Sequence, residues 1–302
     1  MKSNEEIKKE LRLRDRVIRV LAKDKQIRAI AVKNTVAVKT AQKNHELGFV
    51  PATLLAKMLS AASLIASTLK GEERVVLETN SDGHITKLFA EALRVGEVRG
   101  YAIQSKDINL EEVKNSDFIG LGLLTVSKVL YNKSEPTNGI IEIVKGDIAT
   151  DVAYYFTQSE QIPTSLILDV ALDENGTISH SGGIMIQALP GASESDLALV
   201  VENLQNMKRL SEILKQDKTP EEIIAEVLPF EYTVIDSTQV DFFCRCSKDK
   251  FINSLVTFPH KMIVEMEENN ENELVCQYCN AHYKLETEDF DKLKEITLAK
   301  SN

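Results

Sequence analysis

The chain of 302 residues carries 36 basic and 46 acidic side chains, a net charge of −10, and 43% of its residues are apolar. These values are globular, so they exclude wholesale disorder, and the length suits about two domains. A general nucleic-acid binder needs a basic face, which this acidic balance argues against. Residues 1–6 lack an apolar stretch, and the longest uncharged stretch, 175–193, is broken by glycines and a proline. We therefore expect no signal peptide, no membrane span and a cytoplasmic protein.

The predicted elements begin with residues 1–14, a highly charged and mostly solvated helical extension. Strands at 17–21 and 27–32 are followed by an apolar helix over 52–70. Further strands are predicted at 75–79, 85–89, 98–103, 121–126 and 140–144, then a helix over 147–158, and then strands at 166–172 and 178–189. Short turns such as Asp82-Gly83 join consecutive strands and make them pair antiparallel. Residues 15–191 are therefore predicted to be an α+β core domain, a largely antiparallel sheet with helices covering one face.

Residues 192–238 are predicted to form a helical linker. One helix begins at Ser193, and a second begins at Thr219-Pro220 with Glu222 completing a capping box. The linker carries one apolar stripe, formed by Leu197, Val200, Leu204, Met207 and Leu214. A stripe without a core of its own must pack on another part of the protein, and the exposed face of the predicted sheet is the surface we expect to cover it.

The four cysteines lie in the remaining part of the chain, residues 239–302. They are Cys244, Cys246, Cys276 and Cys279, a C-x-C pair and a C-x-x-C pair separated by 29 residues. Two close pairs late in a chain without a signal peptide indicate a metal site rather than a disulfide scaffold. Four thiolates suit one tetrahedral Zn²⁺ ion and leave no position for water, so this zinc would be structural rather than catalytic.

Two histidines, His260 and His282, flank the cysteines and are alternative ligands. With four thiols available, a surface or supporting position is the favoured interpretation for both. His45, His84 and His180 have no recognisable partner in the sequence and are assigned structural positions. A nucleic-acid-binding zinc ribbon is disfavoured, because residues 240–302 contain twelve acidic and eight basic side chains.

A module of this size cannot build much hydrophobic core. Structural zinc contributes about 10–16 kcal/mol of apparent binding free energy in small modules, so loss of the metal should unfold it. Thiolates are also oxidisable, and a disulfide no longer holds zinc. The cysteines alone therefore predict a module whose folding is under redox control.

Several motifs together resemble the redox-regulated 33 kDa heat-shock chaperonin family of bacterial holdases. The tail carries Cys244-Arg-Cys246-Ser247-Lys248-Asp249-Lys250 and Cys276-Gln-Tyr-Cys279-Asn280 followed by Tyr283. The core carries Asp147-Ile-Ala-Thr-Asp-Val-Ala-Tyr-Tyr-Phe156, Ser159-Glu160-Gln161-Ile162-Pro163, Arg99-Gly100-Tyr101, and Gly182-Gly183 leading to Gln187 and Leu189-Pro190-Gly191. The resemblance extends over nearly the whole chain from about Asp15. Residues 1–14, His84 and 132–138 depart from the family pattern, and none of them is a predicted zinc ligand.

The resemblance implies a fold of three parts and a mechanism. In the reduced state, one zinc per chain is held by Cys244, Cys246, Cys276 and Cys279, and the protein is inactive. Oxidation forms the disulfides Cys244–Cys246 and Cys276–Cys279 and releases the metal. The linker then loosens, the chain forms a homodimer, and unfolded client proteins are held without ATP. No catalytic residue, nucleic acid or membrane partner is implied.

Two other functions remain open from the residues alone. One is a thiol–disulfide oxidoreductase using Cys276 and Cys279. Such a pair usually opens a helix, whereas the residues after Cys279 predict a turn entering a short strand. The other is a plain zinc-stapled binding module.

Overall fold

The computed structural model describes residues 13–105 and 118–300. The chain divides into two compact units, residues 1–243 and residues 244–302. The predicted helical extension, residues 1–14, lies outside the described residues except for its last two positions. Each unit has a hydrophobic core of its own.

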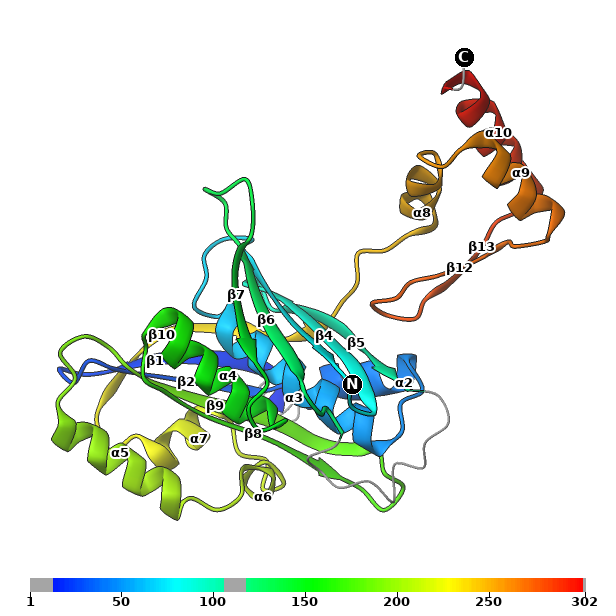
Figure 1. Cartoon of the computed structure of the whole chain (residues 1–302). Coiled ribbons are helices and arrows are strands. Elements are labelled where there is room, and N and C mark those ends of the chain that lie inside the picture. The colour runs from blue at the N-terminus through cyan, green and yellow to red at the C-terminus, as the bar shows by residue number, and fades with distance from the viewer. Residues whose placement is uncertain (1–12, 106–117, 301–302) are drawn as a thin grey trace, which may run out of the picture. The chain divides into compact units, whose positions relative to one another are not determined.

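The first unit contains eleven strands and six α-helices among its described residues (Figure 1). In chain order they are β1 (Arg16–Ala22), β2 (Ile27–Lys33), α2 (Thr35–Asn44), α3 (Phe49–Ala66), β3 (Arg74–Ser81), β4 (Ile85–Leu93), β5 (Glu97–Gln104), β6 (Gly122–Val129), β7 (Thr137–Glu142), α4 (Ile148–Tyr155) with the π-helical turn η3 (Phe156–Glu160), β8 (Thr164–Leu172), β9 (Ile178–Ala188), α5 (Glu194–Asn206), α6 (Leu210–Leu214), α7 (Pro220–Val227), β10 (Tyr232–Gln239) and β11 (Asp241–Phe242).

These strands form two sheets, which confirms the α+β class and the largely antiparallel pairing. The five-stranded sheet has the order β10-β1-β2-β9-β8 and is antiparallel throughout. The six-stranded sheet has the order β11-β5-β4-β3-β6-β7, and only the short β11–β5 pair is parallel. The expectation of a single sheet was wrong in this detail, because the strands divide between two sheets.

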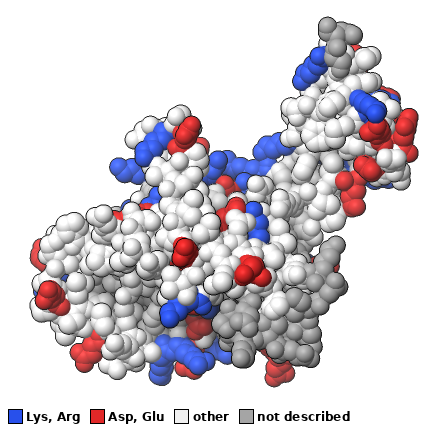
Figure 2. Space-filling view, in the orientation of Figure 1, with Lys and Arg blue, Asp and Glu red and all other residues white. Residues whose placement is uncertain are grey.

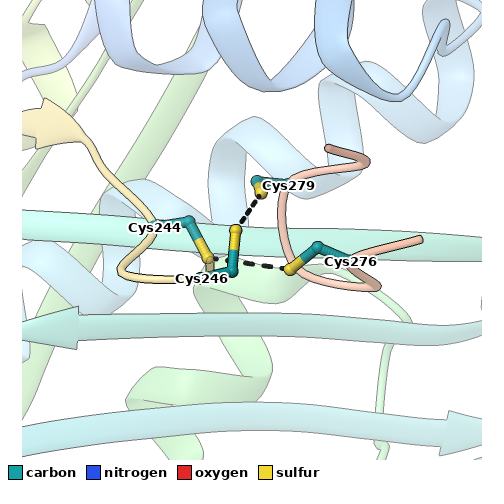
Figure 3. Close-up of side chains that lie close together, drawn as sticks. All are labelled: Cys244, Cys246, Cys276 and Cys279. Atoms are coloured by element: carbon teal, nitrogen blue, oxygen red, sulfur yellow. Dashed lines mark hydrogen bonds between the residues drawn. The ribbon is translucent and has the colours of Figure 1, made fainter. Parts of the chain in front are cut away.

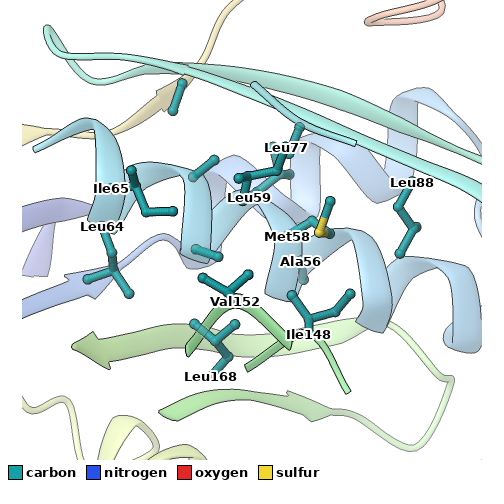
Figure 4. Close-up of a cluster of buried hydrophobic side chains, with 14 of the residues drawn as sticks. Ala56, Met58, Leu59, Leu64, Ile65, Leu77, Leu88, Ile148, Val152 and Leu168 are labelled. Atoms are coloured by element: carbon teal, nitrogen blue, oxygen red, sulfur yellow. The ribbon is translucent and has the colours of Figure 1, made fainter. Parts of the chain in front are cut away.

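The helix α3 lies between the two sheets and forms the centre of the unit (Figures 1 and 4). Its sequence is apolar on nearly every side, with Lys57 as its single charged residue, which suits a helix buried all round. Leu59 and Leu64 of this helix are fully buried, as are Leu77 of one sheet and Met185 of the other. By length and composition alone α3 is a candidate membrane span, but 78% of it is buried inside the unit, as expected of a core helix.

The linker helices cover the opposite face of the five-stranded sheet. Residues of α5, α6 and α7 share one hydrophobic cluster with β1, β2 and β9. The predicted stripe lies in this contact: Val200 and Leu214 are buried, and Leu197, Leu204 and Met207 are partly buried against the cluster. The sequence therefore predicted correctly that the stripe packs on the sheet domain.

The helix starts of the linker follow the predicted caps. The Ser193 hydroxyl accepts a hydrogen bond from the Asp196 N–H at 3.1 Å and so begins α5. At α7, Thr219 and Glu222 make both bonds of the capping box around Pro220. Each cap satisfies helix N–H groups that lack an internal partner, which is why both predicted starts are correct to within a residue.

The predicted extent of the linker requires two corrections. The stripe does not lie on one helix, because the chain leaves α5 at Met207 with an extended backbone and starts the short α6 at Leu210. The end of the segment, within the predicted helical range 192–238, is the strand β10. The zinc module was predicted to begin at residue 239, whereas the first unit continues to Phe243, because β10 and β11 extend its two sheets.

The chain passes from one sheet to the other at residues 239–243. The Val240 N–H donates to the Asp15 carbonyl at 3.0 Å, and the Asp241 N–H donates to the Gly96 carbonyl at 3.0 Å. Gly96 has φ of +93°, and a Cβ there would lie 1.8 Å from the Gln239 carbonyl oxygen. Only glycine allows two backbone segments to approach so closely. The crossing at residues 239–243 therefore depends on Gly96 in the turn between β4 and β5.

A buried carboxylate supports the same crossing. Asp15 is 4% exposed, and one of its oxygens accepts a hydrogen bond from the Ala37 N–H at 2.9 Å in the first turn of α2. The other oxygen has no hydrogen-bond partner among the described residues. Burial raises the pKa of Asp15 to about 6, and Asp241 adds to the rise, while the helix N–H groups and Lys33 oppose it.

Replacing Asp15 with asparagine is expected to stabilise the first unit at neutral pH. Because the folded pKa of Asp15 is raised, ionisation opposes folding: the penalty is absent near pH 4 and complete above about pH 6. Asn keeps an acceptor for the Ala37 N–H and removes the charge, so a gain of about 2 kcal/mol is expected at pH 7.5. Denaturant unfolding at pH 4.5 and 7.5 measures it. A variant that is less stable than the parent at pH 7.5 would contradict this account.

The second unit contains α8 (Lys248–Leu255), α9 (His260–Glu268), β12 (Glu273–Val275), β13 (His282–Lys284) and α10 (Thr287–Lys300). The strands β12 and β13 pair antiparallel as a hairpin. Five buried side chains form its hydrophobic cluster: Leu255, Ile263, Leu285, Phe290 and Leu293. Such a core is small for a chain segment of this length, as the sequence predicted.

Candidate metal centre

The four cysteines come from two short segments of the second unit. Cys244 and Cys246 precede α8, whose N-cap Ser247 accepts a hydrogen bond from the Lys250 N–H at 3.3 Å. Cys276 and Cys279 lie in the turn between β12 and β13. This hairpin is closed by a hydrogen bond from the Cys276 N–H to the Ala281 carbonyl at 2.9 Å. A cap and a hairpin therefore fix the two pairs locally.

The two pairs face each other (Figure 3). The sulfur atoms of Cys244 and Cys276 are 3.8 Å apart, and those of Cys246 and Cys279 are 3.4 Å apart. All four sulfur atoms lie within 4.8 Å of one another, and all four cysteines are free thiols. In a tetrahedral site with zinc–sulfur bonds of about 2.3 Å, neighbouring sulfurs are separated by about 3.8 Å. The donor set and its spacing therefore fit one zinc ion.

The protonation of the thiols also favours a cation at this place. Burial raises the pKa of Cys276 and raises that of Cys279 still further. For Cys246, burial acts in the same direction, but hydrogen bonds from Tyr283 and the other cysteines outweigh it and lower the pKa. Four thiolates this close repel one another, so a divalent cation is what would let them ionise together.

An aromatic side chain completes the surroundings of Cys246. The hydroxyl of Tyr283, in β13, lies 3.2 Å from the Cys246 sulfur. The Tyr283 ring packs against Phe251 of α8, with ring centroids 5.6 Å apart. Tyr283 belongs to the motif that resembles the family, but its contact with Cys246 was not predicted, because spacing along the chain does not show which sulfur a hairpin side chain contacts.

The flanking histidines lie outside the sulfur cluster. The His260 Nδ1 is 3.0 Å from the Thr297 hydroxyl, and the His282 Nδ1 is 2.8 Å from a Glu273 oxygen. Neither histidine belongs to the group of side chains whose ligand atoms gather around the cysteines. This arrangement agrees with the supporting or surface positions expected for both. Of the other histidines, His180 has a buried Nδ1 without a hydrogen-bond partner in the described part of the chain.

The geometry disfavours a dithiol oxidoreductase. A low-pKa thiol of that class usually lies at a helix N-terminus. Here Cys276 and Cys279 lie in a hairpin turn, both are buried, and burial raises the pKa of each. The strand β13 after the turn is the short strand expected from the sequence.

Charges on the surface are mixed in sign. On the face in Figure 2, basic and acidic side chains both occur, and among the residues drawn there the basic ones form no long stripe. The chain as a whole carries a net charge of −10.

Comparisons with known proteins agree with these features. The family model described as Hsp33 protein matches residues 15–286. Among curated relatives, the 33 kDa chaperonin of Bacillus velezensis is 32% identical over 94% of this chain and 99% of its own length. That of Streptococcus gordonii is 29% identical over 92% of this chain and 98% of its own. The crystal structure of the 33 kDa chaperonin from Thermotoga maritima, 24% identical, has the same fold, with a TM-score of 0.87 over 95% of this chain and 99% of its own.

Proposed function

The chain belongs to the Hsp33 family of chaperones, and we propose that it is an ATP-independent holdase activated by oxidation of its four cysteines. The observation that carries the proposal is the cluster of four sulfur atoms within 4.8 Å of one another in a unit with little hydrophobic core. The resting state would be the reduced one. Cys244, Cys246, Cys276 and Cys279 would hold one Zn²⁺ per chain, and when bound the metal keeps the two segments together.

Oxidation removes the ligands in pairs. Two thiols and one molecule of hydrogen peroxide give one disulfide and two molecules of water, and the disulfide sulfurs no longer bind zinc. We propose the pairs Cys244–Cys246 and Cys276–Cys279, whose members stay close in sequence after the unit has unfolded. In the reduced fold, sulfurs of different segments are also close: Cys244 and Cys276 are 3.8 Å apart, and Cys246 and Cys279 are 3.4 Å apart. Unfolding during oxidation would separate the two segments and so favour the proposed pairs.

The linker is the proposed target of the switch. Only residues 240–243 join it to the cysteine unit, and β11, two residues long, holds that segment by a few main-chain hydrogen bonds. Such bonds contribute only about 0.5–1.5 kcal/mol each, so disorder beginning at Cys244 can spread into β10 and then α7. Undocked linker helices would leave the apolar face of the five-stranded sheet open.

The partners follow from this surface. We propose that the uncovered apolar face binds unfolded client proteins, that activated chains form homodimers, and that the protein works in the cytoplasm, where its thiols are kept reduced at rest. The proposal assigns no catalytic residue, nucleic acid or membrane. In this proposal, residues 15–191 stay folded throughout. The linker, which starts at residue 192, leaves the sheet on activation, and the unit that starts at Cys244 responds to the oxidant.

One experiment tests the proposal as a whole. Reduced protein should contain one zinc per chain and fail to prevent aggregation of a chemically unfolded client. After peroxide at raised temperature, it should lose zinc and suppress aggregation. Peptide mapping should then find the two proposed disulfides. Reduced protein with a folded second unit but without metal would overturn the zinc assignment, and mainly Cys246–Cys279 bonds would overturn the pairing. Oxidised, zinc-free protein that does not protect the client would overturn the function.

A further inference from the structure

A tyrosine hydroxyl lies against one sulfur of the cluster. The hydroxyl oxygen of Tyr283 is 3.2 Å from the Cys246 sulfur. When Cys246 is a thiolate, the hydroxyl is the only possible donor of the two groups. Hydrogen bonds to a charged acceptor are about twice as strong as neutral ones, so this contact matters most in the metal-binding form.

The fold holds this hydroxyl in place from two sides. Tyr283 is the central residue of β13 and pairs with Leu274 across the hairpin. Its ring packs on Phe251, which lies in the first turns of α8 and whose N–H donates to the Ser247 carbonyl at 3.2 Å. The helix that begins directly after Cys246 therefore orients the ring whose hydroxyl reaches Cys246. The hairpin and α8 together therefore hold the Tyr283 hydroxyl beside Cys246.

We propose that Tyr283 is a positioning residue for the switch: its hydroxyl donates to the Cys246 thiolate and slows oxidation of that sulfur. The inference rests on the proposed redox function. In the reaction with hydrogen peroxide, the thiolate sulfur attacks one oxygen, the O–O bond breaks, and hydroxide leaves and is protonated to water. The sulfenic acid then reacts with a second cysteine thiol, which forms the disulfide and releases another water.

The direction of the effect follows from the movement of charge. Negative charge leaves the sulfur in the first step, so a donor aimed at that sulfur stabilises the starting thiolate more than the transition state. Removing the donor should therefore speed the attack. It should also weaken metal retention, because partners that support ligands typically contribute about 10-fold or more to metal affinity. Both effects would lower the amount of peroxide needed for activation.

The test is Tyr283→Phe in the full, zinc-loaded chain. Samples quenched during peroxide treatment are alkylated, and mass spectrometry gives an oxidation rate for each cysteine. Cys246 is expected to oxidise about fivefold faster than in the parent, as loss of part of one charge-assisted hydrogen bond implies. The other three sulfurs should change much less. Tyr154→Phe, which removes a hydroxyl from a tyrosine that is 40% exposed in the first unit, is the matched control and should behave like the parent.

Two further measurements separate positioning from general destabilisation. Phe251→Leu keeps the Tyr283 hydroxyl but removes the aromatic ring that packs against Tyr283. This variant should increase the oxidation rate of Cys246 by a smaller factor than Tyr283→Phe. In Co²⁺-loaded protein, Tyr283→Phe should shift the thiolate-to-metal charge-transfer band, because the sulfur loses a hydrogen bond. Equal acceleration of all four sulfurs, or a Cys246 rate unchanged from the parent, would overturn the inference. A parent chain that neither binds metal nor oxidises would instead overturn the proposed function.

Discussion

Ile224→Asp should give a chain that protects clients without any oxidant, at a level close to that of the oxidised parent. Ile224 lies in α7, is fully buried, and belongs to the cluster between the linker helices and the five-stranded sheet. Deleting an apolar side chain at such a site costs about 2–5 kcal/mol, and an unpaired buried charge adds to that cost. The aspartate can reach water only if α7 leaves the sheet.

Once α7 leaves, the rest of the linker has little to keep it folded. The helices α5, α6 and α7 have 13, 5 and 8 residues. Isolated helices shorter than about 12–15 residues are marginal in water, so α6 and α7 at least should melt. The core between the two sheets is a separate cluster and should stay intact. Hydrogen exchange should therefore show loss of protection over residues 194–227 but not in α3.

A control on the same segment isolates the effect of docking. Val201 lies in α5 and is 44% exposed, so Val201→Asp adds the same charge without uncovering the sheet. That variant should remain inactive until it is oxidised. Leu204→Asp, at a partly buried position, should give partial activity. An Ile224→Asp chain whose linker exchanges freely while it fails to protect clients would contradict the linker mechanism.

The sequence predicted elements best where one local signal was strong. The helix starts at Ser193 and Thr219 were predicted correctly. Serine and threonine are favoured N-cap residues, and proline is favoured at the first helical position after the cap. Strands such as β8 and β9 were found from their β-rich composition. The helix predicted at 52–70 is α3, Phe49–Ala66, in the structure. Its ends were misplaced because a helix that is apolar on every side has no change in hydrophobic periodicity to show where it begins and ends.

Among the elements that were not predicted, α2 and β10 are stabilised by tertiary contacts. The helix α2 is rich in β-branched residues, which have low helix propensity, and its N-cap Asn34 makes no side-chain cap bond. Asp15, distant in sequence, accepts from its first turn instead. The strand β10 contains three consecutive β-branched residues, 233–235, but it follows a helical segment, and its pairing with β1 explains why the linker ends as a strand.

The cysteine site was predicted in composition but not in its contacts. Spacing alone indicated four ligands in two pairs, and the structure brings all four sulfurs together. Which sulfurs are nearest across the two segments depends on how α8 and the hairpin pack. The Tyr283 contact depends on the same packing. Spacing along the chain therefore predicts the chemistry of such a site, while the differences among its sulfurs are set by the fold.

Replacing Cys279 with serine should unfold the second unit under reducing conditions and leave the first unit folded. Cys279 is 8% exposed and lies 3.4 Å from Cys246. Structural zinc supplies about 10–16 kcal/mol in small modules, as much as the whole net stability of an ordinary domain, about 5–15 kcal/mol. The second unit, with five buried apolar side chains in its cluster, has no comparable source of stability among its described residues. Chelation of zinc in the parent should have the same result.

The measurements are zinc content, protease sensitivity and hydrogen exchange, with the two units followed separately. His282→Ala removes an exposed ring beside the cysteines and should keep one zinc per chain and full protection of α8 to α10. If Cys279→Ser keeps the second unit as protected as in the parent, the metal does not hold that unit together. If Cys279→Ser is unfolded there and also protects clients without peroxide, then unfolding alone drives activation, and the disulfides serve to make the unfolded state persist.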